Sequence, residues 1–248
     1  MSLIYEERIS DSPYIEKVTR GWTASDGSTI RPAEINWHLV FTRVNGTIYP
    51  LVVGPLAAAG IASWGVGAEI LWLKFKLGVF MPHLPTKDLL DSETILPDAS
   101  SRSFWLKSST WQFPDYDNVE AFVDNLVHEE VLVSDPLVKA VLEGQSPEMS
   151  SRTVRHRFLR ATGVTQSHIY QFERAQRAAT LLQAGASILD TVYAAGYFDQ
   201  PHLTRSLKQF LGYTPAQIVR MSQAENCQTI QDTIPLSEYD TNVLTNIL

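Results

Sequence analysis

The stretch AAGYFDQPHLTRSLKQFLGYTP, residues 194–215, predicts two short helices joined by a tight turn. The first helix ends at Gly196, and the second begins after Asp199 and ends at Gly212, because glycine favours helix C-termini and aspartate favours N-caps. The second helix carries an apolar stripe made of Leu203, Leu207, Phe210 and Leu211. Its other faces carry the cations His202, Arg205 and Lys208. This order of elements is typical of a helix-turn-helix, whose second helix can enter the major groove of DNA.

Helical periodicity extends back to residue 136, and it predicts a second helix-turn-helix at 137–161 in addition to the one at 187–211. A long helix over 166–183, capped by Thr165, joins the two. Eighteen helical residues span about 27 Å at about 1.5 Å per residue. If both second helices face the same way, their separation approaches one turn of B-DNA, about 34 Å. We therefore expect one polypeptide to read two successive major grooves.

Charge is divided unevenly along a chain whose net charge is −7. Residues 1–133 carry a net −7, residues 134–222 a net +4, and residues 223–248 a net −4. The basic segment coincides with the helix-turn-helix patterns, which favours a polyanion-binding module joined to a different domain. The acidic segment after residue 222 is interpreted as a C-terminal tail.

The first half of the chain has the alternating pattern of strands. Residues 35–43, 47–53, 69–77 and 104–106 are predicted as strands, and Asn45-Gly46 predicts a hairpin between the first two. Many short strands with glycine and proline turns indicate a small β-barrel or sandwich. Residues 117–132 change to a helical period, with Asp117 as the expected N-cap and Glu120 three positions later.

Signs of catalytic or metal chemistry are absent from the sequence. It contains no P-loop, no G-x-S-x-G and no G-x-G-x-x-G, and His38 and His83 are isolated. The single cysteine, Cys227, excludes an internal disulfide and a cysteine-rich zinc site. We expect no cofactor, no metal and no enzymatic activity. Aromatic side chains can line a pocket for a small ligand, and the candidates on the β half are Trp37, Trp64 and Trp72.

The helical half resembles the DNA-binding domain of the AraC/XylS transcription regulators. The residues that carry the resemblance are Arg152-Thr153-Val154, Phe158, Thr162-Gly163, Glu173-Arg174-Ala175, Leu181-Leu182 and the run from Gly196 to Pro215. The resemblance covers about residues 136–220 and implies a sequence-specific DNA-binding regulator with an N-terminal β domain of cupin type. The sequence departs from the family pattern at Ser146-Pro147, which interrupts the first supporting helix, and at Thr191 and Val192 in the second.

The expected DNA contacts follow from this resemblance. In the first reader helix they are Ser151, Arg152, Thr153, Arg155 and His156, and in the second they are Gln200, Pro201, His202, Thr204, Arg205 and Lys208. Double-stranded DNA is the implied partner, with RNA polymerase added if the protein is an activator. A small-molecule effector and a homodimer are left open.

The predicted fold class is α+β, with a β-rich cupin-like effector or dimerisation domain at 1–133 that includes the amphipathic helix. An all-α double helix-turn-helix domain follows at 134–222, and an acidic tail at 223–248. No run of 18 apolar residues and no secretory signal occur, so we expect a cytoplasmic protein with no membrane span. The alternative is a β-barrel carrier or enzyme with a helical domain for protein contacts.

Overall fold

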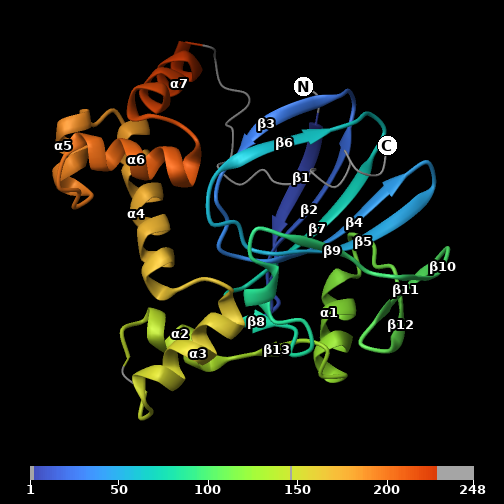
Figure 1. Ribbon diagram of the computed structural model, residues 1–248. Helices are drawn as coiled ribbons and strands as arrows, with labels where there is room; N and C mark the ends of the chain where they lie inside the picture. The colour runs from blue at the N-terminus through green and yellow to red at the C-terminus, as the bar shows by residue number, and fades with distance from the viewer. Residues whose placement is uncertain (1–2, 146, 228–248) are drawn as a thin grey trace.

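The computed structural model describes residues 3–145 and 147–227, and it contains a strand-rich domain followed by a helical domain (Figure 1). The predicted α+β class is confirmed. The strands of the first domain are β1 Leu3–Ile9, β2 Ile15–Thr23, β3 Gly27–Arg31, β4 His38–Val44, β5 Thr47–Val53, β6 Gly60–Trp64, β7 Glu69–Phe75, β8 Val79–Phe80, β9 Glu93–Ile95, β10 Asp98–Ser100, β11 Ser103–Leu106, β12 Ser109–Gln112 and β13 Val133–Ser134.

The helices follow the predicted order. They are the 3-10 helix η1 Thr86–Leu89 and the α-helices α1 Val119–His128, α2 Pro136–Leu142, α3 Ser151–Thr162, α4 Gln166–Gln183, α5 Ile188–Ala194, α6 Gln200–Leu211 and α7 Pro215–Cys227. Helix α7 passes residue 222, where the sequence predicted that the domain would end. The rest of the predicted acidic tail, residues 228–248, lies outside the described residues.

The main sheet has six antiparallel strands in the order β1-β2-β7-β4-β5-β9. Asn45 and Gly46, at φ of 50° and 83°, form the predicted turn between β4 and β5. Among the described strands this sheet does not close, and β1 and β9 lie at its edges. Of the two predicted architectures, a barrel or a sandwich, the structure therefore has the sandwich. One face packs on α1 and β11, and the other packs beneath the two-stranded sheet formed by β3 and β6.

Helix α1 is shorter than predicted and begins differently. Its N-cap is Asn118, which makes no side-chain cap bond, so the prediction that Asp117 caps this helix is wrong. The side chain of Asp115 instead accepts hydrogen bonds from the amides of Asp117 and Asn118, both at 3.0 Å. Glu120, the expected partner in the capping box, is bound by Arg8 and Ser10 of the N-terminal strand region.

The helical domain is organised around α4, which runs as a rod from α2 and α3 at one end to α5, α6 and α7 at the other (Figure 1). Its buried stripe includes Ile169, Phe172 and Leu182. The core around this rod also contains side chains of the β domain, namely Ala33, Ile35 and Phe80. This hydrophobic core therefore extends across both domains, and two further core clusters lie within the β domain.

Candidate nucleic-acid interface

Helix α6 is the second predicted reader, and its two ends are fixed as the sequence predicted. Asp199 accepts a hydrogen bond from the His202 amide at 2.7 Å, and Gly212 ends the helix with a φ of 79°. The buried side chains are Leu203, Ser206, Leu207, Phe210 and Leu211. The remaining predicted contacts form the opposite face, with Gln200, Pro201, Arg205 and Lys208 exposed and His202 and Thr204 half-buried.

The turn before α6 is held by side-chain contacts. The Tyr197 hydroxyl lies 2.8 Å from the Ser206 hydroxyl, and the guanidinium of Arg174 on α4 lies 4.3 Å from the centre of the Tyr197 ring. His202 packs edge-on against the same ring, with a distance of 5.1 Å between the two ring centres. His202 is thus part of the packing that orients α6, while it also lies at the end expected to meet bases.

Helix α5 supports α6 and accommodates the two departures from the family pattern. Thr191 is fully buried, and its hydroxyl donates to the Ser187 carbonyl at 2.9 Å, so no polar group is left unsatisfied. Val192 is 2 % exposed and joins the helical core. Ser187 caps the helix by accepting from the Asp190 amide at 3.1 Å. The second helix-turn-helix is therefore well packed despite these substitutions.

Helix α3 is the first predicted reader. Ser150 caps it by accepting from the Thr153 amide at 3.1 Å, and Gly163 ends it with a φ of 76°. All five predicted contacts are exposed on its first turns: Ser151, Arg152, Thr153, Arg155 and His156. Phe158 and Ala161 are buried on the opposite face.

The support for α3 differs from the usual tight turn. Residues 143–150 separate it from α2, so the connection has eight residues where a helix-turn-helix commonly has three or four. Asp135 bridges the two helices instead. It caps α2 by accepting from the Leu137 amide at 3.0 Å and accepts a bidentate pair of bonds from Arg157 at 3.0 and 2.6 Å. Arg157 is consequently turned away from the exposed face that carries Arg155.

The three tryptophans predicted to bind a ligand do not line one site. Trp37 is buried on the α1 side of the main sheet, where its indole nitrogen donates to the Val79 carbonyl at 2.6 Å. Trp64 on β6 and Trp72 on β7 belong to the core on the other side, between the main sheet and the two-stranded sheet of β3 and β6, and Trp64 donates to the Ser25 carbonyl at 3.1 Å. Their predicted role stays a prediction.

A cavity of about 610 Å³ opens elsewhere on the β domain, between the main sheet and the segment that precedes α1. Its aromatic walls are Trp22, Phe41, Phe113 and Tyr116, and Arg20 and Arg43 lie at its margin. Arg43 pairs with Glu69 at 3.3 Å, and Arg20 pairs with Glu6 and stacks on the Tyr116 ring at 4.4 Å. Within residues 3–145 and 147–227, no three His, Cys, Asp or Glu side chains gather as a metal site would require.

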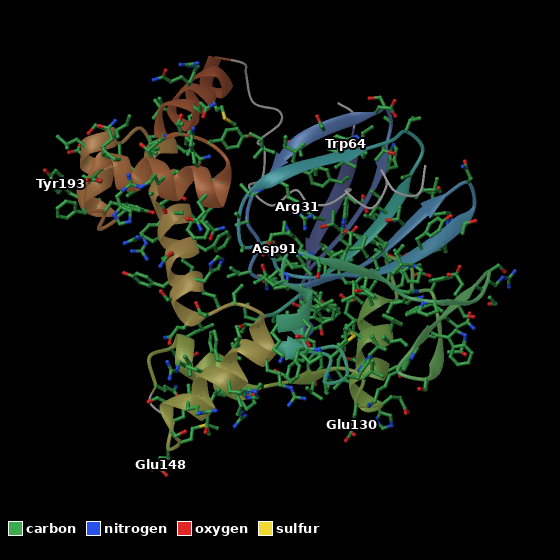
Figure 2. All side chains as sticks on the ribbon, viewed as in Figure 1. Arg31, Trp64, Asp91, Glu130, Glu148 and Tyr193 are labelled. Carbon is green, nitrogen blue, oxygen red and sulfur yellow. The ribbon has the colours of Figure 1, made fainter. Side chains whose placement is uncertain are left out.

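One exposed apolar surface of the helical domain was not predicted from the sequence. Leu189 and Tyr193 on α5 are 61 % and 73 % exposed, and Phe198 in the turn before α6 is 89 % exposed. Figure 2 places Tyr193 on the side of α5 away from the β domain. The four-residue spacing of Leu189 and Tyr193 could have indicated a second apolar face on this helix.

The comparisons with known proteins agree with this geometry. Residues 146–221 match the family described as a helix-turn-helix domain, in its AraC type. Residues 146–221 of the chain therefore form a helix-turn-helix domain of the AraC type. This match begins after α2 and includes α3, the α4 rod and both helices of the second helix-turn-helix.

The remaining comparisons show weak similarity or none. The 1.65 Å structure of ToxT from Vibrio cholerae aligns with 89 % of this chain and 99 % of its own, at 10 % identity and a TM-score of 0.32. A search of curated protein sequences gives no match to the chain. In the part of the chain that the structure describes, no helix is long and apolar enough to span a membrane.

Proposed function

We propose that this AraC/XylS-type regulator binds a specific double-stranded DNA sequence by placing α3 and α6 in two successive major grooves. The observation that supports this most directly is the division of α6 into a fully packed stripe and an exposed face. Arg205 and Lys208 lie on that face, beside the exposed N-terminal residues Gln200 and Pro201. Helix N-termini and cationic side chains both favour phosphate oxygens, and the first turns of a reader helix approach base edges.

The spacing of the two readers supports the two-groove arrangement. Helix α4 has 18 residues and therefore spans about 27 Å. One reader lies at each end of this rod (Figure 1). Because successive major grooves on one face of B-DNA are about 34 Å apart, two readers carried by such a rod fit neighbouring grooves.

The exposed side chains divide into two roles under this proposal. Gln200 is suited to bidentate contact with adenine, and Arg205 to bidentate contact with guanine. Lys208, further from the N-terminus of α6, and Arg155 on α3 supply positive charges for phosphates. The function is binding, and no step of it requires catalysis.

The test begins with selection of bound fragments from a random DNA pool at fixed salt, which supplies the operator. Arg205→Ala is then compared with the wild-type protein on that operator. We expect a loss of about 1–3 kcal/mol if Arg205 reads a guanine. Arg102→Ala is the matched control, because it removes an exposed arginine from the turn between β10 and β11, far from the helical domain. Equal affinities for the Arg205→Ala and wild-type proteins would refute the assignment.

A small-molecule effector is part of the same proposal, and the cavity beside Tyr116 supports it. A volume of about 610 Å³ lies in the usual range for ligand sites, and aromatic walls favour a planar ligand. The fluorescence of Trp22, which is 49 % exposed in this cavity, provides the assay. A planar aromatic probe that does not itself fluoresce at tryptophan wavelengths, such as benzoate, should change the emission of the wild-type protein, and Trp22→Phe should remove most of that change. Equal responses of the two proteins would place the ligand elsewhere. A homodimer and a contact with RNA polymerase stay predictions.

A further inference from the structure

The C-terminal end of reader helix α6 is bonded to the β domain through main-chain atoms. The Ala59 amide donates to the Gln209 carbonyl and the Ala33 amide donates to the Phe210 carbonyl, each at 2.7 Å. The last carbonyl groups of a helix have no partner within the helix and are usually satisfied by capping groups or by water. Here two of them are satisfied by loops of the other domain, so the position of α6 is set by the β domain.

The same end of α6 also approaches the β domain too closely for a side chain. Gly212 has a φ of 79°, and a Cβ atom built on it would lie 2.4 Å from Cγ2 of Ile30 and 3.4 Å from Cβ of Ala59. A separation of 2.4 Å is far inside van der Waals contact. The β-branched Ile30 has few rotamers with which to move aside. A Cβ atom at 212 can therefore be admitted only if Ile30, β3 or α6 shifts, and each of these shifts disturbs the docking of α6 on β3.

Reader helix α3 is held by the β domain in a similar manner at the other end of the α4 rod. A Cβ atom on Gly163 would lie 2.8 Å from the Thr86 carbonyl oxygen of η1. The guanidinium of Arg160 lies 5.5 Å from the centre of the Phe80 ring on β8. Helix α3 packs on η1 and β8 as well as on α2, which compensates for the long connection between α2 and α3.

The loop whose Ala33 amide bonds to α6 is anchored within the β domain by buried charged side chains. Glu34 follows Ala33 and lies 3.2 Å from the ammonium group of Lys74 on β7. Burial opposes the charge on Lys74, but Glu34 and Glu16 together raise its pKa, so its ammonium group is held charged. The Asn36 side chain donates to the Phe75 carbonyl at 2.6 Å. The loop that carries the Ala33 amide is consequently fixed to the main sheet.

We propose that the β domain is a clamp that sets the distance and angle between α3 and α6, with Ala33, Ala59 and Thr86 as positioning residues for DNA recognition. The clamp leaves both predicted contact faces exposed, so it orients the readers and does not cover them. This inference rests on the proposed reading of two grooves. It adds that the spacing between half-sites is selected by contacts in the β domain, outside the family-matched residues 146–221.

The test uses the full chain and the variant Gly212→Ala. Gly185→Ala is the matched control, because Gly185 also follows a helix at positive φ, 91°, but a Cβ atom there meets nothing within 4 Å. Ile30→Ala removes the Cγ2 atom that would collide, so the double variant Ile30→Ala/Gly212→Ala should restore the wild-type docking. Binding is measured on the selected operator, on operators with one base pair added or removed between the half-sites, and on an operator with the α3 half-site scrambled.

We expect Gly212→Ala to weaken binding to the intact operator by about tenfold or more, which corresponds to about 1.4 kcal/mol. Its preference among the spacing variants should broaden, while its affinity for the scrambled operator should match the wild-type value. Gly185→Ala and the double variant should behave like the wild type. Equal losses in Gly212→Ala and Gly185→Ala would overturn the clamp, because backbone strain alone would then explain both.

A second measurement tests the proposed clamp in the absence of DNA. Spin labels are placed through Arg152→Cys and Lys208→Cys, with the chain's one native cysteine removed by Cys227→Ser. The distance distribution between the labels should be narrow in this background and in Gly185→Ala, and should broaden in Gly212→Ala. An unchanged distribution in Gly212→Ala would overturn the clamp whatever the DNA results. If the distribution broadens in Gly212→Ala as expected but the wild-type protein binds no DNA, the clamp is supported and the proposed function is refuted.

Discussion

The guanidinium of Arg174 stacks over the ring of Tyr197, with 4.3 Å between the guanidinium carbon and the ring centre. Arg174 belongs to the long helix α4, and Tyr197 belongs to the turn that precedes reader helix α6. The Nη2 atom of Arg174 also lies 3.4 Å from Nε2 of His202 on α6 itself. One side chain therefore joins the rod, the turn and the reader of the second helix-turn-helix.

Replacing Arg174 should loosen this junction. Arg174→Ala removes a cation–π contact worth about 0.5–2 kcal/mol, so we expect the free energy of unfolding to fall by about 1 kcal/mol. Arg174→Lys should recover only part of the loss, because an ammonium group cannot stack as a planar guanidinium does. Urea unfolding followed by circular dichroism measures both. Arg177→Ala, which removes an exposed arginine one turn further along α4, is the control. Identical midpoints for Arg174→Ala and Arg177→Ala would contradict the role assigned to the stacking.

Lys208 should affect how DNA binding depends on salt. If its ammonium group neutralises one phosphate, Lys208→Ala should reduce the slope of log K against log salt by about one unit and weaken binding similarly on all sequences. Titrations between about 50 and 200 mM salt on the operator and on a scrambled duplex measure this. Arg205→Ala is the informative comparison, because a base-reading residue should lower affinity mainly on the operator. An unchanged slope for Lys208→Ala would remove Lys208 from the interface.

Most elements of the helical domain could be predicted from short-range patterns in the sequence. Thr165 and Asp199 were predicted as caps, and each accepts a hydrogen bond from a backbone amide three positions later. These contacts are short in sequence and are made by particular side chains, so a pattern can reveal them. The two exposed reader faces follow from the same periodicity.

The attachment of the readers to the β domain left no such signal. The Ala33 and Ala59 amides that bond to α6 belong to the main chain, which every residue type shares. Their partners are also about 150 or more positions away in the chain. The erroneous cap at Asp117 has a related cause, because Asp115 accepts from the amides of Asp117 and Asn118, and Arg8, more than 100 residues away, binds Glu120. Non-local contacts of this kind determine which of several possible local structures forms, and a local sequence pattern does not distinguish these structures.

The buried pair of Lys74 and Glu34 should be costly to break. Glu34 is 2 % exposed, and the side chain of Lys74 is 15 % exposed. Removing one member of a buried ion pair leaves an uncompensated charge, and such changes cost about 3–5 kcal/mol. We therefore expect Lys74→Met to lower the free energy of unfolding by an amount in this range, measured by urea unfolding. Lys87→Met, at an exposed surface pair with Asp88, is the control and should change stability little. A small effect of Lys74→Met would mean that the Ala33 loop is anchored by other contacts.

Glu120 should make the attachment of the N-terminal strand to α1 sensitive to acid. Hydrogen bonds from Arg8 at 2.5 and 2.9 Å, together with one from Ser10 at 2.8 Å, lower the pKa of Glu120 from 4.5 to about 2. Because the pKa is lower in the folded state, the stabilisation is fully present above about pH 4.5 and is lost as the pH falls towards 2. Glu120→Gln should therefore be less stable than the wild type at neutral pH, and the difference should shrink through this interval. The measurement is a double-mutant cycle with Arg8→Gln, in which the coupling energy from urea unfolding is followed against pH. A coupling energy that stays constant from neutral pH to about pH 2 would show that the charge on Glu120 does not stabilise this contact.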